Sequence, residues 1–167
     1  MLRRVFSSAT PVSALSLFQN SCYHKIDFKI SENNTVHQAV KKFTAFNVGC
    51  LAVTNSQNHV VGVLSERDYV HKVALLGIDA KTVNIRKVCT YEPNMILARQ
   101  HDSIEVCMQK MLMKDCRHLL VVDEKGQECV GLISMKDVIK ELMRNKNDMI
   151  TRLSNFNMGR GGYFGSE

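Results

Sequence analysis

Two segments of the chain carry the same set of a hydroxyl, a cation and a carboxylate, each following a glycine and two apolar residues. The sets are Ser65, Arg67 and Asp68 in the first segment and Ser134, Lys136 and Asp137 in the second. Such a carboxylate can accept hydrogen bonds from two adjacent ribose hydroxyls, and a cation beside it can neutralise a phosphate. If each serine begins a helix, the free backbone N–H groups there also favour phosphate. The pattern therefore predicts a nucleotide site, although Ser and Asp at this spacing also form an ordinary helix cap.

The other side chains offer no catalytic arrangement. The sequence has no phosphate-binding loop, no G-x-G-x-x-G motif and no nucleophile that a motif pairs with a base. The 6 cysteines include no C-x-x-C pair, and the cysteines and the 6 histidines show no zinc-like spacing. We therefore expect no enzyme activity, no metal and no catalytic cofactor, with free and mostly buried thiols.

The two segments belong to an internal repeat. Gly62, Ser65 and Asp68 recur 69 residues later, and upstream Val53 lies opposite Val121 at an offset of 68. One extra residue around 126–128 accounts for the difference, because a turn accepts an insertion easily.

Each copy reads as a β-α-β-β-α unit. In the first copy these elements are an extended segment at 26–30, a helix capped by Asn34 or Thr35, strands at 50–53 and 60–64, and a helix from Ser65 to Gly77. In the second copy they are 95–98, 104–114 after a cap at Asp102 or Ser103, 119–122, 130–133, and a helix from Met135 toward Phe156. The strands carry no polar alternation, so the copies must pack on each other. We predict an α/β (α+β) fold.

The remaining segments flank or join the repeats. Residues 1–26 contain Arg3, Arg4 and Lys25 and no acid, which accounts for +3 of the net charge of +6. This Ser-rich composition is typical of a mitochondrial transit peptide, with a disordered tail as the alternative, and the mitochondrial matrix is the expected compartment. The predicted boundaries are 1–24 for this segment with cleavage within 17–24, 25–78 for the first repeat, 79–93 for a linker with a helical turn at 83–88, 94–156 for the second repeat and its C-terminal helix, and 157–167 for a flexible tail.

The duplicated Gly-h-h-Ser-x-x-Asp endings (h is apolar), the run RHLLVVDEKG and the helix–strand–strand–helix order resemble a pair of CBS domains, named after cystathionine β-synthase. The resemblance covers about 25–143. It implies two repeats packed with pseudo-twofold symmetry, clefts that bind AMP, ADP, ATP or in some members NAD or S-adenosylmethionine, and association as a homodimer.

The resemblance also implies roles for individual residues. Asp68 would accept the ribose hydroxyls of one cleft, with Ser65 and Arg67 near phosphate, Thr90 at the adenine or phosphate side, and Cys116 and Arg117 closing it; His118, beside Arg117, is a further candidate. The related cleft would use Ser134, Lys136 and Asp137, closed by Val48, Gly49 and the segment 24–26. The two copies differ at one of these positions, because the first has Gly49 where the second has Arg117. The second cleft therefore lacks one candidate phosphate ligand. We therefore expect unequal clefts, with the Asp68 cleft favouring more phosphates.

Three functions follow from different readings of these residues. The first is a nucleotide sensor that regulates a partner protein, which the resemblance suggests is a thioredoxin or another matrix enzyme. The second is a structural or assembly protein that has kept the fold and lost the ligand. The third, nucleic-acid binding through Lys81, Arg86, Lys87 and the last helix, is disfavoured because residues beyond 26 carry only +3 net charge. No apolar run approaches the ~18 residues that span a membrane, so a membrane protein is not expected.

Overall fold

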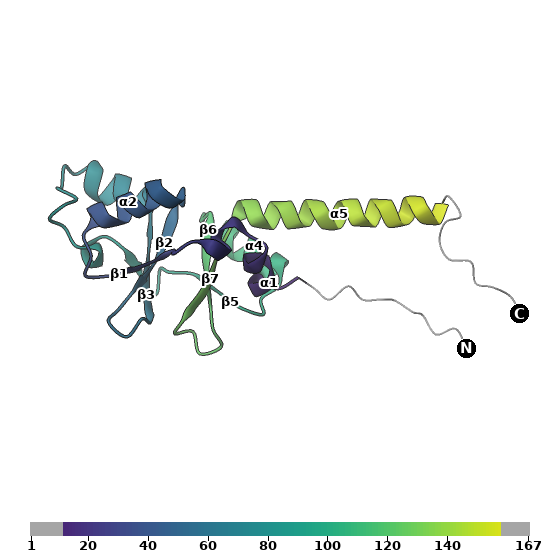
Figure 1. Ribbon diagram of the computed structural model, residues 1–167, viewed down its shortest axis with the longest axis horizontal. Coiled ribbons are helices and arrows are strands. Elements are labelled where there is room, and N and C mark those ends of the chain that lie inside the picture. The colour runs from purple at the N-terminus through teal and green to yellow at the C-terminus, as the bar shows by residue number, and fades with distance from the viewer. Residues whose placement is uncertain (1–11, 158–167) are drawn as a thin grey trace, which may run out of the picture.

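Two small β-sheets stand side by side with helices packed on them (Figure 1). The computed structural model describes residues 12–157. One sheet has the strand order β1-β2-β3-β4, and the other has the order β5-β6-β7. Each sheet contains the strands of one repeat, so the predicted α/β fold of two packed repeats is confirmed.

The first repeat begins with β1 (Lys29–Ser31), which pairs in parallel with β2 (Cys50–Thr54). The crossover between them is α2 (Val36–Phe46), which Thr35 caps together with Gln38 and which ends at Asn47 in the left-handed region, φ 51°. Strand β3 (Val60–Ser65) returns antiparallel to β2 and leads into α3 (Glu66–Tyr69) and the π-helical turn η2 (Val70–Ala74). Gly77, at φ 64°, ends this helical run where the sequence predicted it.

The second repeat copies this order. Its elements are β5 (Leu97–Arg99), α4 (Ile104–Met113) with Ser103 as its cap, β6 (His118–Val122), β7 (Cys129–Ser134) and α5 (Met135–Asn157). The registers match as well, because Cys50 pairs with Ser65 in one sheet and His118 pairs with Ser134 in the other. The two serines that start the candidate sites therefore occupy equivalent positions.

The core lies between the sheets and under the helices. Strand β2 is buried along its whole length, which explains why its sequence shows no polar alternation. Four of the cysteines (Cys50, Cys89, Cys107 and Cys129) are buried, and each of the six is a free thiol. Burial raises the pKa of Cys107 and of Cys129 to about 11, so these thiols act as small apolar groups.

The segment between the repeats is more structured than a linker. The predicted helical turn is present as the short 3-10 helix η3 (Ile85–Lys87). It is followed by β4 (Thr90–Tyr91), which adds a fourth strand to the first sheet by pairing Thr90 with Val63. The sequence did not predict this strand, because two residues carry too little pattern.

Part of the N-terminal segment is folded against the second repeat. Residues 12–24, expected to be part of a transit peptide or disordered segment, form α1 (Ala14–Gln19) and most of η1 (Cys22–Lys25). Ala14, Leu17, Phe18 and Tyr23 are buried in the common core, so apolar burial holds this segment in place. Residues 1–11 of the predicted transit peptide and residues 158–167 of the predicted tail lie outside the described residues.

Helix α5 begins against the second sheet and extends well beyond it (Figure 1). With 23 residues it is about 34 Å long. No helix within residues 12–157 combines the length and apolar character that a membrane crossing requires.

Candidate functional site

A cleft of about 220 Å³ lies between the two repeats. All six residues that the sequence assigned to the first cleft line it: Ser65, Arg67, Asp68, Thr90, Cys116 and Arg117. The β3–α3 junction positions the first three, β4 positions Thr90, and the α4–β6 loop of the second repeat positions the last two. The cleft therefore gathers side chains that are far apart in the sequence.

Asp68 is the centre of the hydrogen bonds in this cleft. Its Oδ2 accepts from the backbone nitrogen of Ser65 at 2.9 Å and from the Ser65 hydroxyl at 2.7 Å. Its Oδ1 accepts from Lys72 Nζ at 2.6 Å and from the Thr90 hydroxyl at 3.3 Å. Asp68 therefore caps the helix through one carboxylate oxygen, while the other bonds with Lys72 and Thr90.

Lys72 is a partner of Asp68 that the sequence analysis missed. Its Nζ also donates to the carbonyl of Val88 at 2.9 Å, which ties α3 and η2 to the segment before β4. Burial raises the pKa of Asp68, but hydrogen bonds from Lys72 and Ser65 outweigh it and hold this pKa below its ordinary value. Asp68 is therefore ionised at neutral pH. The signal was available, because Lys72 follows Asp68 by four residues on a helix.

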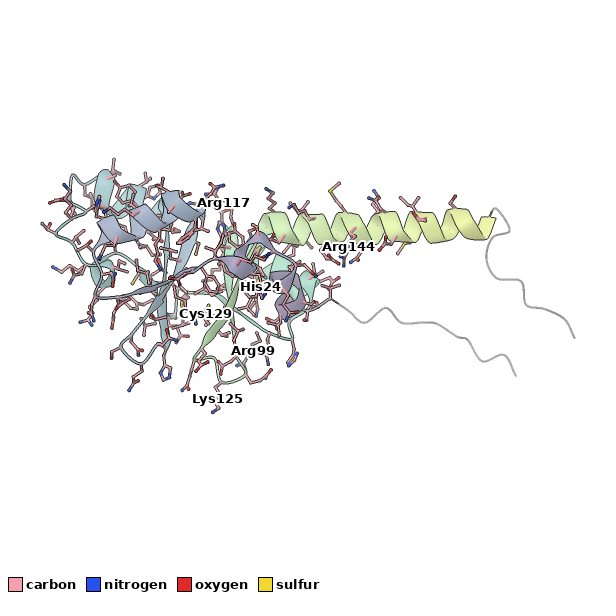
Figure 2. All side chains as sticks on the ribbon, in the orientation of Figure 1. His24, Arg99, Arg117, Lys125, Cys129 and Arg144 are labelled. Carbon is pink, nitrogen blue, oxygen red and sulfur yellow. The ribbon has the colours of Figure 1, made fainter. Side chains whose placement is uncertain are left out.

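Cations of both repeats line the cleft that contains this carboxylate. Arg67 reaches across the cleft and donates from Nη1 to the carbonyl and to the carboxylate of Asp115, both at 3.3 Å. Arg117 and Lys114 line the cleft from the second repeat. Figure 2 shows Arg117 at the outer edge of the body, between α2 and the start of α5. An anion in the cleft would therefore meet cations from both repeats.

His118 and Gly49 also line this cleft. A Cβ atom at Gly49 would lie 3.1 Å from Cε1 of His118, so the absence of a side chain makes room for the imidazole. Burial, with the positive charge of Arg117, lowers the pKa of His118, which is neutral at pH 7. Gly49 was assigned to the second cleft, but the structure places it on the wall of the first.

The second cleft differs from its expected form. Ser134 and Asp137 lie together, as predicted, and are 6% and 7% exposed. The Ser134 hydroxyl donates to Asp137 Oδ2 at 2.6 Å, as in the first repeat. Of the other residues expected at this cleft, Lys136 is exposed and Val48 is buried in the core.

Tyr23 lies beside this second Ser–Asp pair. The sequence analysis had assigned this place to the segment 24–26, which begins one residue later. The ring of Tyr23 stands edge-to-face to His118 with the centroids 6.2 Å apart. Burial raises the pKa of the Tyr23 phenol, while a hydrogen bond with Ser134 lowers it, and the net shift is upward. The side chain of Tyr23 is therefore a neutral hydroxyl packed against the second Ser–Asp pair.

A charge is also reversed between the two sites. Glu141 follows Asp137 at the spacing at which Lys72 follows Asp68. Glu141 is buried and accepts from Arg144 Nη2 at 2.7 Å. A pocket of about 200 Å³ beside Asp137 is lined by Cys22, Lys140, Glu141 and Arg144. Two buried carboxylates are therefore neighbours at this site, where the first cleft has the Asp68–Lys72 ion pair.

No group of three or more His, Cys, Asp or Glu side chains within residues 12–157 could hold a metal ion. Of the cations considered for nucleic-acid binding, Arg86 forms an ion pair with Glu32 at 3.1 Å. The described side chains thus point to the Asp68 cleft as the site with the most convergent polar chemistry.

Comparison with known proteins gives a family match over most of the chain. The family model described as CBS domain matches residues 7–75 and 85–144. The chain is 30% identical over 129 residues to the CBS domain-containing protein CBSX3, mitochondrial, of Arabidopsis thaliana. This alignment covers 76% of the chain and 62% of the relative, so the chain spans less than two thirds of that protein.

Solved structures share the fold. A protein with CBS domains from Burkholderia ambifaria superposes with a TM-score of 0.69 at 25% identity, covering 79% of this chain and 94% of that one. The CBS domain protein PAE2072 of Pyrobaculum aerophilum, complexed with AMP, gives a TM-score of 0.62 at 22% identity, covering 72% and 93%. The first family match begins at residue 7, which agrees with a folded N-terminal segment.

Proposed function

Since this chain belongs to the CBS-domain family, we propose that it is a regulatory module that binds an adenine nucleotide in the Asp68 cleft. The observation that carries the proposal is the ionised carboxylate of Asp68, which lies in an open cleft with Arg67 and Arg117 from different repeats. A ribose needs such a carboxylate, and a phosphate needs such cations.

In the proposed complex, the ribose hydroxyls donate to Asp68, and the phosphates lie near Arg67 and Arg117. Thr90 borders the adenine or phosphate side, and Ser65 fixes the carboxylate. The AMP bound to the Pyrobaculum relative supports this ligand class. The candidates are AMP, ADP, ATP, NAD and S-adenosylmethionine, each as a regulatory ligand and not as a catalytic cofactor.

Regulation follows from the position of the cleft between the repeats. A ligand that touches both repeats stabilises the arrangement of them that it binds more tightly, and a partner protein can read that arrangement. We propose a matrix partner, such as a thioredoxin or an enzyme, and a mitochondrial location, which the mitochondrial Arabidopsis relative supports. We assign no enzymatic activity to the chain itself.

We further propose that the module is a homodimer. Several large apolar side chains are exposed on the second helices of the two repeats: Val70, Leu75, Leu76, Ile139 and Met143. Val73 and Val138, which lie in the same helical segments, are instead buried in the core. Pairing of two copies through these helices would cover the exposed set. A monomer mass at tens of micromolar in sedimentation velocity would contradict the dimer.

A thermal-shift screen tests the nucleotide proposal. A ligand at about 100 times its Kd adds roughly 2.7 kcal/mol to the folded state, which raises Tm by about 5–10 °C for a chain of this size. AMP, ADP, ATP, NAD, NADH and S-adenosylmethionine are compared on the wild type and on Asp68→Ala. We expect a shift with at least one ligand that the variant loses. No shift with any of them would favour a structural protein that has kept the fold without the ligand.

A further inference from the structure

The N-terminal segment packs on the second repeat as the inter-repeat segment packs on the first. Asn84 forms a bridge to Thr35, the cap of α2, and Ser13 forms the same bridge to Ser103, the cap of α4. Further along each segment, a glycine on the neighbouring strand allows a close approach. A Cβ at Gly131 would lie 2.7 Å from the ring of Phe18.

The matching glycine of the first repeat is Gly62, where a Cβ would lie 3.0 Å from the carbonyl of Thr90. The segment 13–25 is thus the counterpart of the segment 84–94. The two differ in what they place beside the Ser–Asp pair. The inter-repeat segment offers the small hydroxyl of Thr90 to Asp68, which leaves the cleft open.

The N-terminal segment instead brings a whole aromatic side chain. Tyr23 is buried, and its ring lies edge-to-face to His118, which pairs with Ser134 across the second sheet. The ring of Tyr23 therefore lies beside the second Ser–Asp pair.

We propose that Tyr23 is an internal occupant of the second cleft, which closes a latent adenosine-binding site at Ser134 and Asp137. This inference rests on the proposed function for the class of ligand. The chain then binds one nucleotide, at Asp68. The latent site has Glu141 in the position of Lys72, so once opened it binds the nucleoside without a preference for its phosphate.

Isothermal titration of the full chain with AMP and with adenosine tests the proposal. We expect the wild type and Tyr23→Phe, which keeps the ring, to bind one molecule per chain. Tyr23→Ala should bind two, and the added event should have about the same Kd for AMP and for adenosine. Asp137→Ala in the Tyr23→Ala background should remove the added event alone. A stoichiometry of one for a folded Tyr23→Ala protein would overturn the proposal.

Two further measurements distinguish a failure of the proposed Asp68 site from a failure of the Tyr23 proposal. Suppose that the wild type binds no nucleotide, that Tyr23→Ala binds one, and that adding Asp137→Ala removes this binding. This result would reject the proposed Asp68 site and still support Tyr23 as the occupant of the second cleft. If Tyr23→Ala does not fold, hydrogen–deuterium exchange of the wild type decides. The amide of Ile26, which donates to the Tyr23 carbonyl at 3.1 Å, should keep its slow exchange at saturating AMP. Faster exchange there, with two AMP bound, would overturn the proposal.

Discussion

Lys72 and Asp68 form an ion pair across one helical turn, with Nζ 2.6 Å from Oδ1. A carboxylate offers about four acceptor positions. In Asp68 these are taken by the nitrogen and hydroxyl of Ser65, by Lys72 and by Thr90. Ribose hydroxyls can therefore bind Asp68 only by displacing one of these donors, so ligand binding must rearrange the contacts that Lys72 makes.

Replacing Asp68 should weaken nucleotide binding. Asp68→Ala removes charge-assisted hydrogen bonds worth about 1.5–3 kcal/mol, which corresponds to a loss of roughly 10- to 150-fold in affinity. Isothermal titration measures this, with Asp137→Ala as the matched control that leaves the affinity at the Asp68 cleft unchanged. Unchanged affinity in Asp68→Ala, with only the loss of stability of about 0.5–2 kcal/mol expected for a helix cap, would show that Asp68 is a cap alone.

Removing Lys72 should tighten the binding of adenosine. Lys72→Met leaves Oδ1 of Asp68 without its cation, so a ribose no longer competes with a partly exposed ion pair. Such pairs contribute about 0.3–1 kcal/mol, and we expect adenosine affinity to rise by about 2- to 5-fold. Lys114→Met, which alters a cation of the same cleft that the structure does not pair with Asp68, is the control. Weaker binding of adenosine to Lys72→Met would mean that the lysine contacts the nucleoside directly.

The lowered pKa of Asp68 predicts how stability depends on pH. A carboxyl group whose pKa is lower in the folded state stabilises the fold above its unfolded pKa, and this contribution is lost as pH falls through the folded pKa. The unfolded value is about 3.8. Urea denaturation of the wild type and of Asp68→Asn should give a constant difference in unfolding free energy at pH 5–7 that shrinks below about pH 4. A difference that grows on acidification would contradict the assigned shift.

The contact between Phe18 and Gly131 predicts a coupled pair of mutations. A methyl group at residue 131 would collide with a buried ring, so Gly131→Ala should cost about 1–3 kcal/mol in urea denaturation. Phe18→Leu replaces the aromatic ring by a smaller side chain, which leaves more room for the added methyl group. It should therefore relieve part of this cost. The double variant should therefore lose less stability than the sum of the single variants, by more than about 0.5 kcal/mol. Additive losses would show that the N-terminal segment does not pack on β7.

The sequence predicted those parts of the fold whose signals are local. The elements of both repeats followed from apolar runs bounded by caps and turns, as at Thr35 and Gly77, and the Asp68 cleft followed from the motif and the family resemblance. The helices in segment 12–24 were not predicted, because the acid-free composition of this segment suits a leader. Its apolar residues Leu17 and Phe18 acquire their role only through contacts with the second repeat.

The two Ser–Asp sites differ mainly at residues other than the one on which the sequence analysis relied. The departure at Gly49 suggested unequal charge, whereas Gly49 contacts His118 in the first cleft. The larger differences are the reversed charge at Glu141 and the ring of Tyr23. Neither belongs to the repeated motif, so comparing the motifs could not reveal them.

The docking of α1 on β7 has a consequence for the order in which the protein folds. Ala14 donates to the carbonyl of Asp102, and Phe18 packs against Gly131, so early residues contact the end of the second repeat. During synthesis the first repeat can form as soon as it leaves the ribosome, but α1 has no partner until β7 has been made. Closing so long a loop is slow, because the chain loses entropy before any contact compensates it. The segment that completes the second repeat is thus translated before both repeats and folds after them.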